Sequence, residues 1–347
     1  MTYEKPGQRK KERSSEKYMK LLTLNIHSHF DKMSQEQFDL ALQELTKFIV
    51  AEKVDIVALQ ECSQSCEAAI VEGKLPGKYV TADRGRTFVP IRTADKGPSP
   101  VPARDEGPSP VPDEKIGDEG PSPVPRDKGP SPVPREDNFA GLLARGLEEM
   151  GESYCWSFTG AKIGYDRFDE GLAIFSRHEV KAAEAFYFSN QTDYHNWKSR
   201  KAIGFCVPIN GVDHWFYAVH MGWWKDDEEP FAEQMDRLHK RVLSHVQNKK
   251  ERVFLMGDFN SQANIRGEGY DYVRKLGWQD SYVAAEQKDS GITVPGTIDG
   301  WTDVESGMRI DYIFSNEAVQ VQSSRVVFSG ISEPVISDHF GVMAEIV

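Results

Sequence analysis

Amphipathic segments of helix length alternate with short apolar runs along most of the chain. In residues 34–53 the apolar positions recur at the spacing of one helix face. That face comprises Phe38, Ala41, Leu42, Leu45, Phe48 and Ile49. Ser34 and Gln37 have the spacing of a capping box, so we expect this helix to begin there. Helices are expected over residues 34–53, 138–152, 231–248 and 269–277.

Short apolar runs that end in polar residues predict β-strands, and these runs outnumber the expected helices. They cover residues 20–28, 55–61, 170–177, 201–209, 214–222, 252–260, 308–315, 319–330 and 339–347. An excess of strands over amphipathic helices favours two sheets packed together with helices outside. The expected fold class is therefore α/β (α+β).

One segment interrupts this alternation with a proline-rich repeat. The sequence GPSPVP occurs at residues 97–102, 107–112, 120–125 and 129–134, separated by irregular charged spacers. Irregular spacing argues against a solenoid, and the proline density favours extended chain without a packed core. We expect a disordered insertion at about 92–137 within a surface loop, although a proline-motif docking segment is an alternative.

Composition and charge restrict the class of partner. The 347 residues carry a net charge of −12, and no apolar run is long enough for a membrane span. We therefore expect neither a membrane nor a nucleic acid as partner. Residues 1–18 are charged and lack the apolar stretch of a secretory signal, which favours a disordered tail or a misassigned start and a cytoplasmic location. The four cysteines are expected as reduced thiols, because no second pair completes a zinc site.

Carboxylate, amide and imidazole side chains follow or interrupt several of the apolar runs. They are Asn25, Glu61, His220, Asp258, Asn260, Asp311, Asp338 and His339. Each alone has a structural explanation, such as a turn or a helix cap. Together they predict a buried polar site, and clustered carboxylates repel one another unless a cation is present. Oxygen ligands with open positions for water and phosphate suit Mg²⁺ or Mn²⁺.

The ordered motifs TLNIHS, ALQE, EGLAIFSR, VHMG, GDFN, RIDYIF and SDHFG resemble the endonuclease/exonuclease/phosphatase superfamily. The resemblance covers the chain from about residue 19 to 347, except the insertion. It implies a single domain with a four-layer α/β sandwich, in which two mixed β-sheets pack face to face with helices outside. It also implies metal-assisted attack of water on phosphorus.

The resemblance implies roles for individual residues. The metal ligands would be Glu61, Asn25, Asp338 and Asp258. His220 would bind a phosphate oxygen, while Asp258 and Asn260 would position the attacking water. His339, oriented by Asp311, would act as general base or phosphate stabiliser, and Asp258 is the other candidate for the base.

A basic cluster and a carboxylate extend this candidate site. Lys198, Arg200 and Lys201 precede an expected strand, and we interpret them as a phosphate clamp or, alternatively, as a solvated basic turn. Glu170 begins the EGLAIFSR motif, in a region that lines the cleft in the superfamily.

Aromatic residues suggest the substrate. Trp223 and Trp224 follow His220, and Trp301 precedes the strand of Asp311, each with acidic residues nearby. Indole faces with acidic neighbours suit a sugar ring better than a DNA backbone, although the tryptophans can instead pack their own loops. The phrases HMGWW, EGLAIFSR, WKSRKA and DGW…RIDY resemble the bacterial maltose-6'-phosphate phosphatase branch, which implies a phosphorylated disaccharide substrate. A phosphodiesterase or nuclease of the same fold and a non-catalytic binding protein remain the alternatives.

Overall fold

The computed structural model describes residues 18–28, 33–82, 133–297 and 307–347. Nearly all of the expected tail, residues 92–132 of the expected insertion and Trp301 lie outside the described residues. Residues 133–137, the end of the expected insertion, are described, and backbone hydrogen bonds hold them to residues 69–71. Val71 N donates to Pro134 O at 3.2 Å, and Glu136 N donates to Ala69 O at 2.9 Å. These backbone bonds anchor the chain before residue 138.

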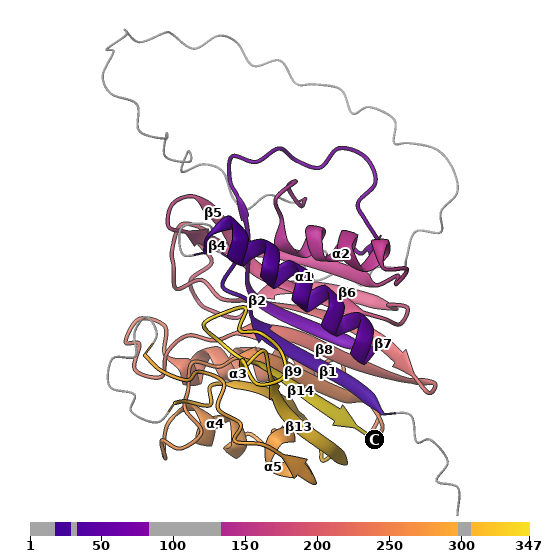
Figure 1. The fold of residues 1–347 in the computed structure, drawn as a ribbon. Helices are drawn as coiled ribbons and strands as arrows, with labels where there is room; N and C mark the ends of the chain where they lie inside the picture. The colour runs from indigo at the N-terminus through magenta and orange to yellow at the C-terminus, as the bar shows by residue number, and fades with distance from the viewer. Residues whose placement is uncertain (1–17, 29–32, 83–132, 298–306) are drawn as a thin grey trace, which may run out of the picture.

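Two mixed β-sheets form the centre of the molecule (Figure 1). The larger sheet has the order β11-β13-β14-β1-β2-β5-β4-β3. Its strands are β1 (Met19–Asn25), β2 (Ile56–Ser65), β3 (Lys78–Tyr79), β4 (Cys155–Gly164), β5 (Phe168–Ser176), β11 (Gln287–Lys288), β13 (Val321–Val327) and β14 (Gly341–Ile346). The smaller sheet has the order β10-β12-β9-β8-β7-β6. Its strands are β6 (Ala182–Tyr187), β7 (Lys201–Ile209), β8 (Val212–His220), β9 (Arg252–Asp258), β10 (Gln279–Asp280) and β12 (Asp311–Ser315).

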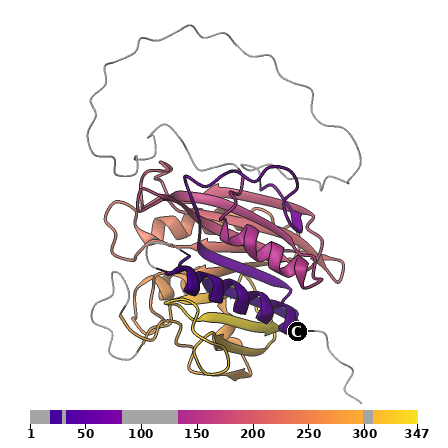
Figure 2. The same cartoon turned by 45° about the horizontal axis from the view of Figure 1, so that its top comes forward.

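The helices lie outside the sheets, as Figures 1 and 2 show. They are α1 (Gln35–Glu52), α2 (Phe139–Glu149), α3 (Phe231–Leu243), α4 (Gly269–Lys275) and α5 (Ser281–Ala284). Helices α1 and α2 lie side by side, with Phe38 and Phe139 in edge-to-face contact at 5.3 Å. The capping box predicted for α1 is confirmed, since the Ser34 side chain accepts from Gln37 N while the Gln37 side chain accepts from Ser34 N.

Three apolar layers hold these elements together. One lies between the large sheet and α1 and α2, and a second lies between the small sheet and α3 and α4. The third fills the space between the sheets, with Ile56, Ile174, Phe205, Phe216 and Phe254 among its residues. The expected four-layer α/β sandwich is thereby confirmed. Within the described residues, no helix is both long and apolar enough to cross a membrane.

A buried carboxylate ties the small sheet to α3. Glu184 on β6 accepts from Tyr217 Oη at 2.7 Å and Arg241 Nη2 at 2.5 Å, and it lies 2.8 Å from His245 Nε2. The helix expected over 231–248 ends at Leu243, and the turn that follows brings His245 to this carboxylate. Burial opposes ionisation, but hydrogen bonds from His245 and Tyr217 hold the pKa of Glu184 below its ordinary value.

Strand direction explains where the polar residues gather. Strand β1 runs parallel to β2, and β8 runs parallel to β9, so the carboxyl ends of each pair meet at one edge. Strands β14 and β12 run antiparallel to β1 and β9, so they begin at the same edge. Asp311 consequently pairs with Asp258 across β12 and β9.

One expected strand end is wrong. Strand β2 continues to Ser65, and its pairing with β5 is irregular between Leu59 and Cys62. Glu61 lies in this bulge with a left-handed φ of 47°. An extra residue in one strand changes the direction of its side chain. The bulge, and not the end of the strand, therefore changes the direction of the Glu61 side chain.

Candidate active site

Two carboxylates lie close to one imidazole at the sheet edge where β1 ends. His27 Nδ1 lies 2.9 Å from Glu61 Oε2 and 3.7 Å from Asp338 Oδ2. Asn25 Nδ2 donates to Glu61 Oε1 at 2.9 Å and to Asp258 Oδ2 at 3.3 Å. Asn25 thus links Glu61 on the large sheet to Asp258 on the small one.

The position of His27 was not predicted from the sequence, although it stands in the TLNIHS motif. Burial opposes its protonation, but the hydrogen bond to Glu61 and the charges of Glu61, Asp338 and Glu170 raise the pKa of His27 to about 9. A protonated imidazole therefore lies between two carboxylates. The position favours positive charge.

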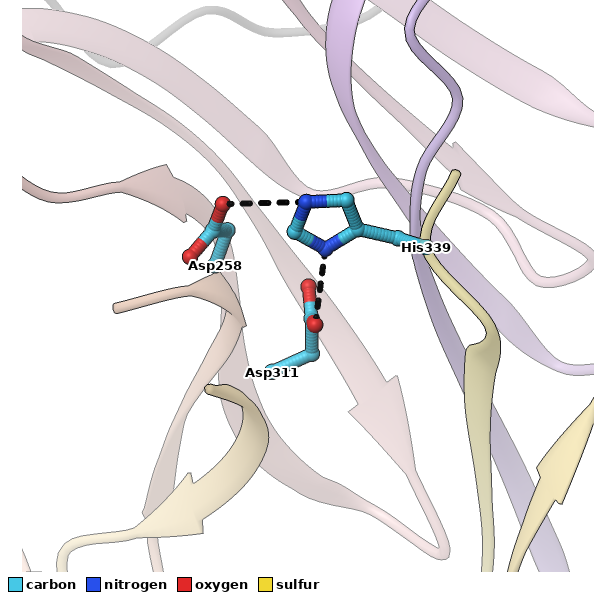
Figure 3. Close-up of side chains that lie close together, drawn as sticks. All are labelled: Asp258, Asp311 and His339. Carbon is cyan, nitrogen blue, oxygen red and sulfur yellow. Dashed lines mark hydrogen bonds and ion pairs between the residues drawn. The ribbon is translucent and has the colours of Figure 1, made fainter. Parts of the chain in front are cut away.

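A second group lies deeper and centres on His339 (Figure 3). Its Nδ1 lies 2.9 Å from Asp311 Oδ2, and its Nε2 lies 3.9 Å from Asp258 Oδ2. The three side chains are buried, and their ligand atoms lie within 4.8 Å of one another. The Asp311 carboxylate fixes the orientation of the ring and leaves Nε2 directed at Asp258.

Charge crowding changes how this group titrates. Burial raises the pKa of Asp258, and the neighbouring charge of Asp311 raises it further. Burial opposes protonation of His339, but the charge and hydrogen bond of Asp311 raise the pKa of His339 to about 10. His339 is therefore the cation that these two carboxylates share.

His220 and Asn260 form a third group on the ends of β8 and β9. Asn260 Nδ2 lies 3.1 Å from His220 Nε2 and donates to Met221 O at 3.0 Å. Trp223 Nε1 donates to Asn260 Oδ1 at 3.1 Å, which determines how the amide points. Burial and the charge of Arg200 lower the pKa of His220 well below its ordinary value, so its ring is neutral.

These residues line one cavity of about 300 Å³. Its lining consists of His27, Glu61, Lys162, Ile163, Gly164, Tyr165, Glu170, Trp197, Arg200, His220, Trp223, Asp258, Asn260, Asp338 and His339. Asn25 and Asp311 support the wall from behind through Glu61 and His339. The polar residues predicted from different parts of the sequence thus lie around a common space.

The structure separates the members of the basic cluster. Arg200 lines the cavity, whereas Lys198 Nζ lies 2.9 Å from Asp226 Oδ1 outside the lining. Lys201 Nζ donates to Gly160 O at 2.7 Å and is likewise outside the lining. The expected clamp of three cations therefore reduces to one arginine in the cavity wall.

A second cation in the wall, Lys162, was missed by the sequence analysis. Its Nζ lies 3.0 Å from Oε1 of Glu170. The predicted Glu170 also lines the cavity. Burial lowers the pKa of Lys162, which the charge of Glu170 partly offsets. The pairing of β4 with β5 shifts register between Gly160 and Lys162, so Lys162 is the first paired residue after the shift. A shift of strand register is not visible in a hydrophobic pattern.

The structure also separates the two consecutive tryptophans. Trp223 lines the cavity and is 40% exposed, while Trp224 packs against Phe231 and Tyr272 beside α3 and α4. Loop packing, the structural alternative, thus accounts for Trp224. Trp197, which the sequence analysis overlooked, lies with its ring centre 6.0 Å from that of Trp223 and is 51% exposed.

The donor set fits a hard divalent cation. Glu61, Asp338 and Asp258 bring carboxylate oxygens to the cavity, where Asn25 Nδ2 donates to Glu61 and Asp258. Oxygen donors of this kind suit Mg²⁺ or Mn²⁺. Burial and the neighbouring charge of Asp311 raise the pKa of Asp258, and a bound cation would favour its ionised form. The group of Asp258, Asp311 and His339 fits such an ion less well, because Asp311 already hydrogen bonds His339 Nδ1.

Comparison with solved structures identifies chains with this fold. An endonuclease/exonuclease/phosphatase family protein from Leptotrichia buccalis C-1013-b is 26% identical, with a TM-score of 0.69 over 95% of this chain and 99% of that chain. The mannosyl-6-phosphatase Bt3783 from Bacteroides thetaiotaomicron VPI-5482 is 17% identical, with a TM-score of 0.58 over 95% and 99% of the two chains. TDP2 from Caenorhabditis elegans is 13% identical, with a TM-score of 0.53 over 95% and 74%.

The sequence itself matches one protein family. No curated protein matches the sequence. The Endonuclease/Exonuclease/phosphatase family matches residues 22–339, which include the residues gathered around the cavity. The chain belongs to the Endonuclease/Exonuclease/phosphatase family.

Proposed function

We propose that this chain is a Mg²⁺-dependent, cytoplasmic phosphomonoesterase that acts on a sugar phosphate, with maltose 6'-phosphate as the first compound to test. One observation carries the proposal. A single cavity combines a polar group that fits a divalent cation with the exposed aromatic rings of Tyr165, Trp197 and Trp223. The first feature suits phosphoester chemistry, and the second suits a sugar ring.

The proposed metal ligands are Glu61, Asn25, Asp338 and Asp258. The bound cation would neutralise charge on the phosphate and on the leaving oxygen. Asn25 would also position two of these ligands, because its amide nitrogen hydrogen bonds both Glu61 and Asp258.

The remaining residues would position water and phosphate. Asp258 and Asn260 would hold the attacking water, whose oxygen bonds to phosphorus as the ester oxygen leaves. The raised pKa of His339 favours an imidazolium that stabilises the phosphate, which leaves Asp258 to accept the proton of the water. His220, whose neutral ring keeps one N–H, would bind a phosphate oxygen.

The sugar part of the proposal rests on the cavity wall. The fold occurs in both a mannosyl-6-phosphatase and TDP2, so fold alone does not select the substrate. A cavity of about 300 Å³ is within the range for small-molecule sites. Trp197 and Trp223 present tilted indole faces at 58° to one another, against which the C–H face of a pyranose can pack.

The test is phosphate release with Mg²⁺ from a panel of sugar phosphates that includes maltose 6'-phosphate. Nicking of supercoiled plasmid is measured in parallel, and Glu61→Ala provides the blank. We expect rapid release from a sugar phosphate, intact plasmid and no release by the variant. Plasmid nicking without phosphate release would show a phosphodiesterase and refute the proposal.

A further inference from the structure

Arg200 is a buried cation without a partner. The residue is only 6% exposed, and its Nε is a buried donor that has no hydrogen-bond partner. Among the residues that the structure describes, its guanidinium forms no hydrogen bond and no ion pair. A guanidinium carries five N–H donors and no acceptor, so burial without acceptor atoms is unfavourable. Such a group requires an explanation.

Another, partly buried arginine of this fold is satisfied by its neighbours. Arg309 Nη1 lies 2.8 Å from Asp280 Oδ2, and its guanidinium stacks on the rings of Tyr270, Tyr282 and Tyr312. The other cation of the cavity wall, Lys162, is neutralised by Glu170 at 3.0 Å. Arg200 therefore differs from both in facing the cavity with its donors unused.

The surroundings of Arg200 indicate what would satisfy it. Glu170, Asp258 and Glu61 attract its charge, but none of them is in ion-pair contact with it. It lines the cavity together with His220 and Asn260, the proposed phosphate-binding residues. The missing acceptor therefore belongs to an anion bound within this cavity. A phosphoryl group fits, because the planar fork of arginine can bind two of its oxygens.

We propose that Arg200 binds the third non-bridging oxygen of a terminal phosphoryl group and thereby selects phosphomonoesters over phosphodiesters. This inference rests on the proposed function and assigns the residue that selects its substrate class. A monoester has three non-bridging oxygens and nearly two negative charges at neutral pH. A diester has two such oxygens and one charge, and an organic substituent occupies the third position. The N–H donors of Arg200 would then face that substituent and not a charged phosphate oxygen.

The experiment compares Arg200→Met with the matched variant Arg309→Met in the full chain. The kcat/KM values are measured with Mg²⁺ for 4-nitrophenyl phosphate and for bis(4-nitrophenyl) phosphate. We expect Arg200→Met to lower the monoester value by roughly 10- to 150-fold, the range for a hydrogen bond to a charged group. The diester value is expected to change little, so the preference for monoesters collapses.

Thermal unfolding separates a binding role from a structural one. In buffer without phosphate, Arg200→Met should retain or raise the Tm, because it removes a buried charge that lacks partners. Arg309→Met should lower the Tm, because it leaves Asp280 unpaired. Inorganic phosphate should raise the Tm of the wild-type protein and have a smaller effect on Arg200→Met.

The outcomes distinguish this inference from the proposed function. A wild-type preference for the diester would refute both. A wild-type preference for the monoester with equal losses on both esters in Arg200→Met would refute only the selection by Arg200. A Tm for Arg200→Met as low as that of Arg309→Met would show a structural role and also refute the inference.

Discussion

The indole N–H of Trp223 offers a way to separate the orientation of a catalytic amide from contact with substrate. Trp223 Nε1 donates to Asn260 Oδ1 at 3.1 Å, and the Asn260 amide in turn lies 3.1 Å from His220 Nε2. Trp223→Phe keeps an aromatic ring but removes this donor. The Asn260 amide then keeps only the contacts of its Nδ2 with Met221 O and His220 Nε2, so the position of the water that it would hold becomes less defined.

The expected size of this effect follows from the loss of one hydrogen bond. A neutral hydrogen bond contributes about 0.5–1.5 kcal/mol, which corresponds to a roughly 2- to 12-fold change in rate. We therefore expect Trp223→Phe to lower kcat by about that factor with little change in KM. Trp223→Ala also removes the ring, whose burial by a ligand is worth about 1.5–3 kcal/mol, so KM should rise roughly 10- to 150-fold.

The assay is steady-state kinetics on the sugar phosphate that the wild-type protein hydrolyses. Trp224→Phe is the matched control, since Trp224 packs against Phe231 and Tyr272 and does not line the cavity. An unchanged kcat in Trp223→Phe would show that the indole N–H does not orient Asn260. An equal loss of kcat in Trp224→Phe would mean that the effect comes from general loosening of the loop.

Three further predictions concern metal binding and stability. Glu61→Gln should abolish both phosphate release and the rise in Tm that Mg²⁺ gives the wild-type protein; an unchanged Mg²⁺ response would exclude Glu61 as a ligand. Glu184→Ala should cost about 1–3 kcal/mol of unfolding free energy at pH 7, measured with urea, because it leaves the buried Tyr217 hydroxyl without its acceptor. Folding lowers the pKa of Glu184, so the stability from its ionised form should be present above the unfolded pKa of about 4.3. This stability should decline as the pH falls through the folded pKa. A stability difference between wild type and variant that persists undiminished in acid would contradict this. Gly171→Ala should destabilise by about 1–3 kcal/mol, because a Cβ there would lie 2.0 Å from Thr159 O, whereas Gly296→Ala, with nothing within 4 Å, should be neutral; equal effects would refute the steric argument.

The parts of the site that sequence reasoning could place are those carried by strand ends. An apolar run followed by a polar residue indicates a strand that leaves the core, and parallel strands bring such residues to one edge. Asn25, Asp258 and Asn260 were found in this way, and Asn25 and Asp258 indeed hydrogen bond across the two sheets. The first helix was equally predictable because its capping box is a local pattern.

The parts that sequence reasoning missed depend on the direction of a side chain. Trp223 and Trp224 are adjacent, yet one lines the cavity and the other packs beside helices. Arg200 and Lys201 likewise diverge, because neighbouring side chains near a strand point to opposite faces. Lys162 reaches the cavity after a shift of register in β4. Each outcome depends on tertiary packing, which residue types and their spacing do not encode.

The local costs at this cavity argue against a purely structural explanation of its polar residues. Glu61, His27 and Asn260 have left-handed φ values of 47°, 46° and 45°, a conformation that costs non-glycine residues of order 1–3 kcal/mol. Asparagine tolerates it best, whereas a residue needed only to turn the chain at position 61 would be glycine or asparagine rather than glutamate. Glu61 instead directs its carboxylate toward His27, beside Asp338. Together with the unpartnered Arg200, this strain is what a fold retains when it must hold specific charges around a ligand.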